Sequence, residues 1–280
     1  MWWNGAMDQE TGWQIGRVID SAVDEQTVTA FGRDGAVCLH GIIDEALLGR
    51  VAVDVAANLA DPSPLGIVAS TDDDPGFFVE DFCNWSRRPS YLDAARAVAP
   101  VMAALMGSER VWLHHDHVLA KSAGTTTPTP WHQDQPYYDI EGSQMVSLWI
   151  PLAAVPRADS LEFLAGSHLG PWLLPRTFKD RAAQWFAEGT LADVPDIEAD
   201  RSAHDIIGWE LAPGDAICFH ALALHSAPGS GVDRRALSLR FIGDDARRVE
   251  RPWRTSPPLP GDAEFPLVFD AAGDAAGPGR

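Results

Sequence analysis

The chain has 280 residues, and its 40 acidic and 21 basic side chains give a formal net charge of −19 at neutral pH. Hydrophobic residues make up 46% of the sequence and charged residues 22%, as in ordinary soluble globular proteins, which excludes a chain that is disordered throughout. The strongly negative charge argues against general binding to nucleic acids or to anionic membranes, because both require a positive electrostatic field.

The cysteines and the apolar runs predict a cytoplasmic protein. Cys38, Cys83 and Cys218 lie far apart and form no CxxC pair. This is typical of a reducing compartment and argues against a disulfide framework or a clustered-cysteine zinc site. Residues 1–13 lack the basic segment and apolar run of a signal peptide. No run of about 18 apolar residues is present, so we expect no membrane partner.

The first part of the chain, up to about residue 107, is predicted to be mainly helical. Residues 28–41 read as a short apolar strand after a turn. Residues 44–60 carry apolar side chains at helical spacing after an acidic start, which predicts a helix. A second helix is expected over residues 91–106, where Pro100 should kink or interrupt it.

After Gly107 the sequence changes to short runs rich in β-forming residues, separated by Gly and Pro. Such regularly spaced strands with turn signals predict an all-β sandwich or barrel. We therefore expect one domain over residues 1–280, mainly β with flanking α-helices. Its parts would be a jelly-roll core over about 108–248, a lid-like insertion over about 170–207, and a C-terminal tail over 249–280.

The segment TPWHQDQPYY, residues 129–138, carries the most informative motif. His132 and Asp134 are two positions apart, so in an extended segment both side chains leave the same face and can bind one metal. His225 is the best candidate for a third ligand, because it ends a strand-like run before a Gly/Pro turn. Two histidines and one carboxylate form the facial triad of non-haem Fe(II) oxygenases. The alternative for the HxD pair alone is a surface hydrogen bond.

An arginine-rich run follows His225. Arg234, Arg235 and Arg240 all lie in the strand-like segment DRRALSLRF, where Arg234 and Arg240 share one face and Arg235 takes the other. A guanidinium group suits the distal carboxylate of a co-substrate such as 2-oxoglutarate, because it can make a two-pronged contact. The alternative is a solvated edge strand, and the residues alone do not select one arginine.

Nearly the whole chain resembles the phytanoyl-CoA dioxygenase family of Fe(II)/2-oxoglutarate-dependent oxygenases. The resemblance is strongest in AKSAGTTTPTPWHQDQPYY, in MVSLWIPLAAVPRADSLEFLAGSHLG and in GWELAPGDAICFHALALHSAPGSGVDRRALSLRFIGDDA. It implies a double-stranded β-helix (cupin-like) core, iron ligands at His132, Asp134 and His225, and Arg234 as the 2-oxoglutarate arginine, opening an R-x-A-x-x-x-x-F stretch. It also implies that Trp149 lines the 2-oxoglutarate pocket, and the alternative for Trp149 is a core aromatic residue on a buried strand.

Three further positions are compared with the family pattern. The family often has a hydroxyl two residues after the distal histidine, where this chain has Ala227, so the neighbouring Ser226 is the candidate for that contact. His115 and His117 lie on a strand that borders the co-substrate pocket in relatives, and either could bond 2-oxoglutarate or substrate. Their alternative is a strand histidine without function.

The resemblance implies an enzyme that uses Fe(II), 2-oxoglutarate and O₂, with ascorbate as a supportive reductant. Its expected reaction is hydroxylation of an unactivated C–H bond of a small molecule, a natural product or an acyl compound, with release of succinate and CO₂. Asp134 favours oxygenation over halogenation, because related halogenases replace this carboxylate with a small residue. Two alternatives are a catalytically silent cupin-like binding protein and a zinc hydrolase on the same ligands. The choice between acyl-CoA and free metabolite, and the oligomeric state, stay open.

Overall fold

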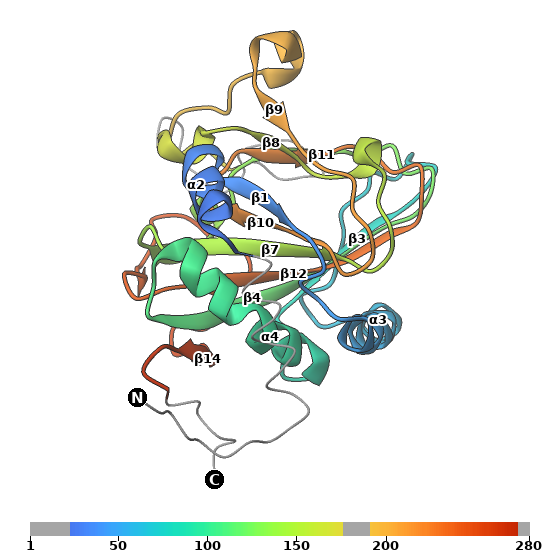
Figure 1. The fold of residues 1–280 in the computed structure, drawn as a ribbon. Coiled ribbons are helices and arrows are strands. Elements are labelled where there is room, and N and C mark those ends of the chain that lie inside the picture. The colour runs from blue at the N-terminus through green and yellow to red at the C-terminus, as the bar shows by residue number, and fades with distance from the viewer. Residues whose placement is uncertain (1–22, 176–190, 274–280) are drawn as a thin grey trace.

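The computed structural model describes residues 23–175 and 191–273. In these residues a large antiparallel sheet lies between a smaller sheet on one side and two helices on the other (Figure 1). The large sheet has the strand order β1 (Ala36–Leu39), β10 (Ala216–His220), β7 (Met145–Pro151), β12 (Arg234–Ile242), β4 (Arg110–Lys121), β3 (Phe78–Phe82), β2 (Ile67–Val68), and β14 (Leu267–Asp270) also pairs with β4.

The smaller sheet has the order β5 (Thr129–His132), β11 (His225–Ala227), β8 (Glu162–Leu164), β9 (Ile206–Ile207). A separate two-stranded ribbon joins β6 (Ile140–Glu141) to β13 (Arg247–Arg248). The helices are α2 (Glu25–Asp34), α3 (Glu45–Ala60) and α4 (Pro89–Met106), with short 3₁₀ turns at Gln135–Tyr137, Arg157–Asp159, Ser167–Leu169 and Ile197–Ala203. The expected fold class, mainly β with flanking helices around a jelly-roll core, is confirmed.

The strand predicted over residues 28–41 is wrong in its first half. Helix α2 occupies residues 25–34, and only Ala36–Leu39 form a strand. The Asp24 side chain accepts a hydrogen bond from the backbone N–H of Thr27, which caps the start of the helix. Gly35 ends it with φ of 80°, a conformation that glycine adopts without steric cost.

Helix α4 runs through Pro100, so the predicted interruption does not occur. Proline removes one backbone hydrogen bond and costs free energy inside a helix. Ten residues of α4 are buried, and this packing against α3 and the large sheet stabilises the helix across the missing bond. The expected helix over residues 44–60 is present as α3, capped by Asp44.

Side chains alternate along the central strands between the hydrophobic core and the cavity. On β7 and β12 one set of side chains joins the hydrophobic core beneath α3 and α4: Val146, Leu148, Ile150, Leu237, Leu239 and Phe241. The intervening side chains face the smaller sheet and include Ser147, Trp149, Ser238 and Arg240. Because successive residues in a strand point to opposite faces, the same strands build the core and one wall of the site.

Parts of the predicted insertion and tail are described. Residues 191–207 contribute a 3₁₀ turn and β9, whereas residues 176–190 of the predicted lid lie outside the described ranges. The tail returns to the large sheet as β14. Among the described helices, none is both long and apolar enough to cross a bilayer.

Candidate active site

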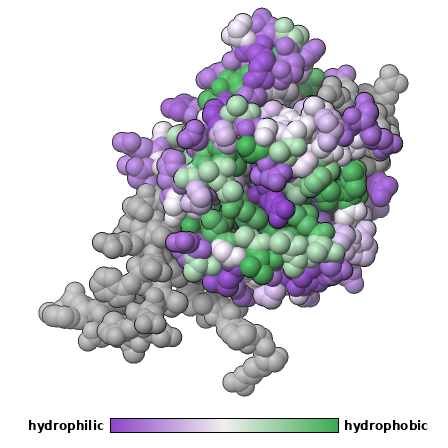
Figure 2. Space-filling model, turned by 90° about the vertical axis from the view of Figure 1, so that its right-hand side faces the viewer, coloured by the Kyte–Doolittle hydropathy of each residue, from purple (hydrophilic) through white to green (hydrophobic). Residues whose placement is uncertain are grey.

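A cavity of about 280 Å³ lies between the two sheets. Figure 2 shows the side of the molecule where β3 and α3 lie in Figure 1, with apolar surface gathered around a small hydrophilic area. The cavity wall is largely apolar, and its polar side chains come from several strands: Glu80, His117, Lys121, Thr129, His132, Asp134, Tyr137, Tyr138, His225, Ser226, Arg234, Ser238, Arg240 and Ser256.

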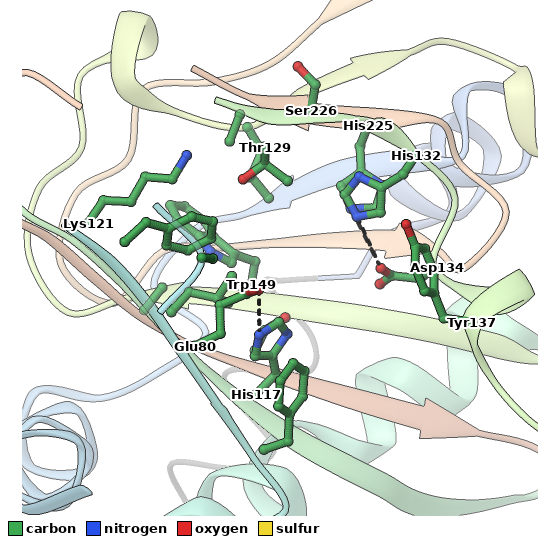
Figure 3. A pocket seen from close by; sticks show the side chains of 18 of the residues that line it. Glu80, His117, Lys121, Thr129, His132, Asp134, Tyr137, Trp149, His225 and Ser226 are labelled. Atoms are coloured by element: carbon green, nitrogen blue, oxygen red, sulfur yellow. Dashed lines mark ion pairs between the residues drawn. The ribbon is translucent and has the colours of Figure 1, made fainter. Parts of the chain in front are cut away.

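His132, Asp134 and His225 converge at one end of this cavity. Their ligand atoms all lie within 4.8 Å of one another, and all three residues are buried. Asp134 Oδ1 lies 3.6 Å from His132 Nε2 and 3.8 Å from His225 Nε2 (Figure 3). His132 on β5 stands directly opposite His225 on β11, which brings the imidazole ring centres to 4.1 Å.

The local geometry differs from the expected extended HxD segment. Strand β5 ends at His132, and Asp134 has helical backbone angles (φ −74°, ψ −47°) in the turn that follows. His225 likewise starts a strand of its own, because residues 221–224 form a turn after β10. His220, the last residue of β10, accepts a hydrogen bond from Leu222 N and lies 2.9 Å from Ser143 O.

Backbone contacts pin the two ligand-bearing turns together. The N–H groups of Asp134 and Gln135 both donate to the carbonyl of Ala221, at 2.8 and 3.0 Å. The Gln133 side chain donates to the carbonyl of Leu222 at 3.0 Å. The carboxylate therefore sits at a fixed place relative to the strand that starts with His225.

Both histidines are arranged to present an unprotonated nitrogen. His132 Nδ1 lies 2.8 Å from Pro130 O and His225 Nδ1 lies 2.9 Å from Ala223 O, so each Nδ1–H donates to a carbonyl and each Nε2 faces Asp134. Burial, and then the neighbouring His132, lower the pKa of His225 to about 3. A neutral imidazole whose other nitrogen donates to the backbone is the usual form of a metal-ligating histidine.

The two carboxylate oxygens of Asp134 have different neighbours: Oδ2 contacts Ser147 and Arg240, whereas Oδ1 faces the two imidazoles. Its Oδ2 accepts a hydrogen bond from Ser147 Oγ at 2.8 Å and lies 3.3 Å from Arg240 Nη2. Burial opposes ionisation, but the guanidinium of Arg240 holds the pKa of Asp134 well below its usual range. Arg240 also donates from Nε to Tyr138 Oη at 3.2 Å. Two imidazoles and one carboxylate fit Fe(II) as a donor set.

A pair of buried cations lies on the same cavity wall, on adjacent strands. Arg234 on β12 is the register partner of Lys121 on β4. Lys121 donates to the carbonyls of Thr127 and Pro228, both at 3.0 Å, and Arg234 donates to the carbonyl of Asp159. Burial, and then Arg234, lower the pKa of Lys121 to about 7, whereas burial lowers that of Arg234 to about 10.

The three arginines of β12 have different surroundings. Arg234 lines the cavity with its guanidinium 5.9 Å from the Trp149 ring centre, while Arg240 lies against Asp134. Arg235 points to the other face and is exposed. Of the three, only Arg234 combines a place in the cavity with hydrogen bonds to carbonyl oxygen alone among the described residues.

Lys121 and Thr129 are two of the cavity residues that the sequence did not single out. Lys121 lies four residues beyond His117 and two beyond Leu119, on the same face of an alternating strand, and this spacing could have indicated it. Thr129 stands opposite Ala227 in the β5–β11 register and places a hydroxyl group beside the position where the family pattern has one. This cross-strand relation has no signal in the linear sequence.

The remaining candidates occupy different places. His117 and Ser226 line the cavity, although the Ser226 hydroxyl points away from the His225 ring in Figure 3. His115 is not among the cavity-lining residues, and its Nδ1 lies 2.8 Å from Nδ1 of His114. Burial lowers the pKa of both His115 and His117, so both imidazoles are neutral near pH 7.

Several solved structures share this fold. The epimerase SnoN in complex with Fe³⁺, alpha ketoglutarate and nogalamycin RO has a TM-score of 0.67 and 21% identity, covering 87% of this chain and 98% of that one. The alpha ketoglutarate dependent carbocyclase SnoK from nogalamycin biosynthesis has a TM-score of 0.66 and 19% identity, covering 88% and 97%. EctD from S. alaskensis with 2-oxoglutarate and 5-hydroxyectoine has a TM-score of 0.62 and 22% identity, covering 86% and 83%.

At 19–22% identity the structural matches establish the fold alone, and the family follows from the sequence comparison. No curated protein matches the chain at a significant level. The sequence model of the family described as Phytanoyl-CoA dioxygenase (PhyH) matches residues 31–236, most of the described chain. The protein thus belongs to the phytanoyl-CoA dioxygenase family and is a non-haem iron, 2-oxoglutarate-dependent oxygenase.

Proposed function

We propose that the protein hydroxylates an unactivated C–H bond of a small-molecule substrate, with release of succinate and CO₂. The observation that carries the proposal is one buried cavity with three metal-ligand side chains at one end and two cations further along its wall. When bound, Fe(II) supplies the oxidising chemistry together with 2-oxoglutarate and O₂.

His132, Asp134 and His225 would hold the metal. The backbone carbonyls that accept from each Nδ1–H keep Nε2 aimed at the shared site, and Ser147 and Arg240 keep Asp134 ionised and oriented. Because Oδ2 is already engaged by the protein, Oδ1 is the carboxylate oxygen that faces both imidazoles.

Arg234 and Lys121 would hold the far carboxylate of 2-oxoglutarate. Within residues 23–175 and 191–273 this guanidinium and this ammonium donate to carbonyl oxygens, so their charge is available to an anion. Trp149 packs against Arg234 and Thr129 stands on the facing sheet, so both border the same end. The apolar wall around them excludes water, which strengthens these charge interactions.

The metal assignment predicts different outcomes for two histidines of one segment. The His225→Ala variant should lose stoichiometric Fe(II) after dialysis, because two protein ligands bind the ion weakly. The His220→Ala variant removes a structural contact to Ser143 and should retain the metal. Metal analysis of the dialysed proteins measures both, and iron retained at wild-type level by His225→Ala would remove this residue from the ligand set.

The co-substrate assignment predicts that charge alone does not suffice at position 234. Arg234→Lys should weaken 2-oxoglutarate binding on the order of tenfold, because lysine lacks the planar two-pronged contact. Arg235→Lys, the matched change on the exposed face of the same strand, should leave binding unchanged. Anaerobic calorimetric titration of the Fe(II) protein measures both affinities, and equal values would refute the assignment.

The Lys121 pKa of about 7 predicts a pH-dependent affinity. The ammonium is charged below pH 7 and loses its proton as the pH rises through 7, so the attraction for a carboxylate is present at low pH and fades above it. The dissociation constant of 2-oxoglutarate should rise roughly tenfold between pH 6 and 8. In Lys121→Met the affinity should be lower at pH 6 and nearly constant over this range. A flat wild-type profile would contradict the role of Lys121.

The proposed reaction predicts where oxygen atoms go. With Fe(II), 2-oxoglutarate, ascorbate and a panel of small metabolites, succinate formation should increase with the true substrate. Under ¹⁸O₂ the product should gain one labelled oxygen atom, detected by mass spectrometry. If succinate forms but the product carries no label and is desaturated or epimerised, the reaction is desaturation or epimerisation and not hydroxylation. A chlorinated product in the presence of chloride would refute oxygenation.

A further inference from the structure

Glu80 and His117 form a polar pair on a part of the cavity wall that neither the metal ligands nor the cation pair occupies (Figure 3). Glu80 comes from β3 and His117 from the adjacent strand β4. His117 Nε2 lies 3.0 Å from Glu80 Oε1, and the imidazole stacks on Phe82 with 4.0 Å between ring centres. Only 2% of Glu80 and 6% of His117 is exposed.

Glu80 and His117 are within ion-pair distance, but their relative orientation does not form a hydrogen bond of good geometry. Glu80 Oε1 and His117 Nε2 are both buried and complete no hydrogen bond of good geometry with the described residues. A buried donor or acceptor without a partner costs about 1–3 kcal/mol, so native proteins rarely keep one without a use. At a cavity wall, a bound molecule can supply the missing partner.

Sheet register places the pair between the two ends of the site. His117 stands opposite Ser238 on β12, which in turn stands opposite Trp149 on β7. Along β12 this row lies between Arg240, which contacts Asp134, and Arg234. A molecule held by the pair would therefore lie beside the path from the metal ligands to the cation pair.

The cavity edge beside the pair is apolar. Ile67 and Val68 of the edge strand β2 line the same cavity and are 50% and 64% exposed, and Ile67 is the register partner of Glu80. Apolar surface at the edge suits a carbon skeleton, whereas the Glu80 carboxylate on the cavity wall repels an anionic group.

We propose that Glu80 and His117 determine specificity by binding a hydroxyl group of an uncharged, otherwise apolar small substrate. A hydroxyl group is both donor and acceptor, so it can donate to the Glu80 carboxylate while it accepts from an N–H of His117. The inference rests on the proposed function, because the substrate is the molecule to be oxidised at the neighbouring metal site. It selects a hydroxylated free metabolite over an acyl-CoA.

Matched probes test the pair without knowledge of the natural substrate. Cyclohexanol and cyclohexanecarboxylate share a ring and differ in the group that would meet Glu80. We expect the Fe(II) protein with saturating 2-oxoglutarate to bind cyclohexanol about tenfold more tightly than the carboxylate in anaerobic calorimetric titrations. Glu80→Gln and His117→Phe should bring this ratio close to one. Glu210→Gln, a matched change at an exposed residue outside the cavity, should leave it unchanged.

The outcomes separate this inference from the proposed function. Titration of 2-oxoglutarate into each variant comes first, and the probes are also titrated without it. A wild-type protein that fails to bind 2-oxoglutarate counts against the proposed function, while its probe ratio still tests the pair. A wild-type ratio near one overturns the specificity role, whatever the folding of the variants. An unchanged ratio in a Glu80→Gln protein that still binds 2-oxoglutarate overturns it as well.

Discussion

The antiparallel pairing of β5 with β11 sets His132 directly opposite His225, and the chemistry of the cavity depends on this register. Opposite residues of paired strands keep their side chains about 5 Å apart, so two imidazoles can reach one ion without any loop to position them. A shift by one residue would turn one ring to the other face of the sheet. The hydrogen bonds from Asp134 and Gln135 to Ala221 add the carboxylate to this frame.

The cavity contains buried cations although the chain as a whole is strongly acidic. The whole chain carries −19, yet Lys121, Arg234 and Arg240 are all buried beside the cavity. Each is held differently: Arg240 faces the carboxylate of Asp134, whereas the other two donate to carbonyl oxygens. Arg240 thus belongs to the metal end, and Lys121 and Arg234, which donate to carbonyl oxygens among the described residues, lie at the end proposed for the co-substrate.

Much of the architecture could be predicted from the sequence, because alternation and turn signals are local properties. The jelly-roll core and helix α3 follow from such patterns, and the alternation that sends Arg234 inward and Arg235 outward follows from strand period alone. The strand assigned to residues 28–34 was wrong because capping by Asp24 and Gly35 outweighed a short apolar run. The interruption of α4 at Pro100 does not occur, because tertiary packing stabilises the helix.

The parts of the site that escaped prediction are relations between strands. Thr129 meets Ala227, Lys121 meets Arg234, and Glu80 meets His117 only after the sheets have paired. No spacing along the chain encodes such neighbours, since they depend on long-range register. The family resemblance predicted the positions of the triad and Arg234 in the sequence. The pairing of β3, β4 and β12 determines which side chains lie beside them in the cavity.

Gln133, the residue between two of the triad positions, connects the site to the segment that follows β8. Its amide nitrogen donates to the carbonyls of Pro171 and Leu222, and its amide oxygen accepts from the N–H of Leu173. A carboxylate of the same shape would turn an oxygen toward two carbonyl oxygens and lose both bonds. The middle position of the motif therefore requires a side chain that both donates and accepts hydrogen bonds. The tripeptide thus supplies two candidate metal ligands and also attaches them to residues 171–173.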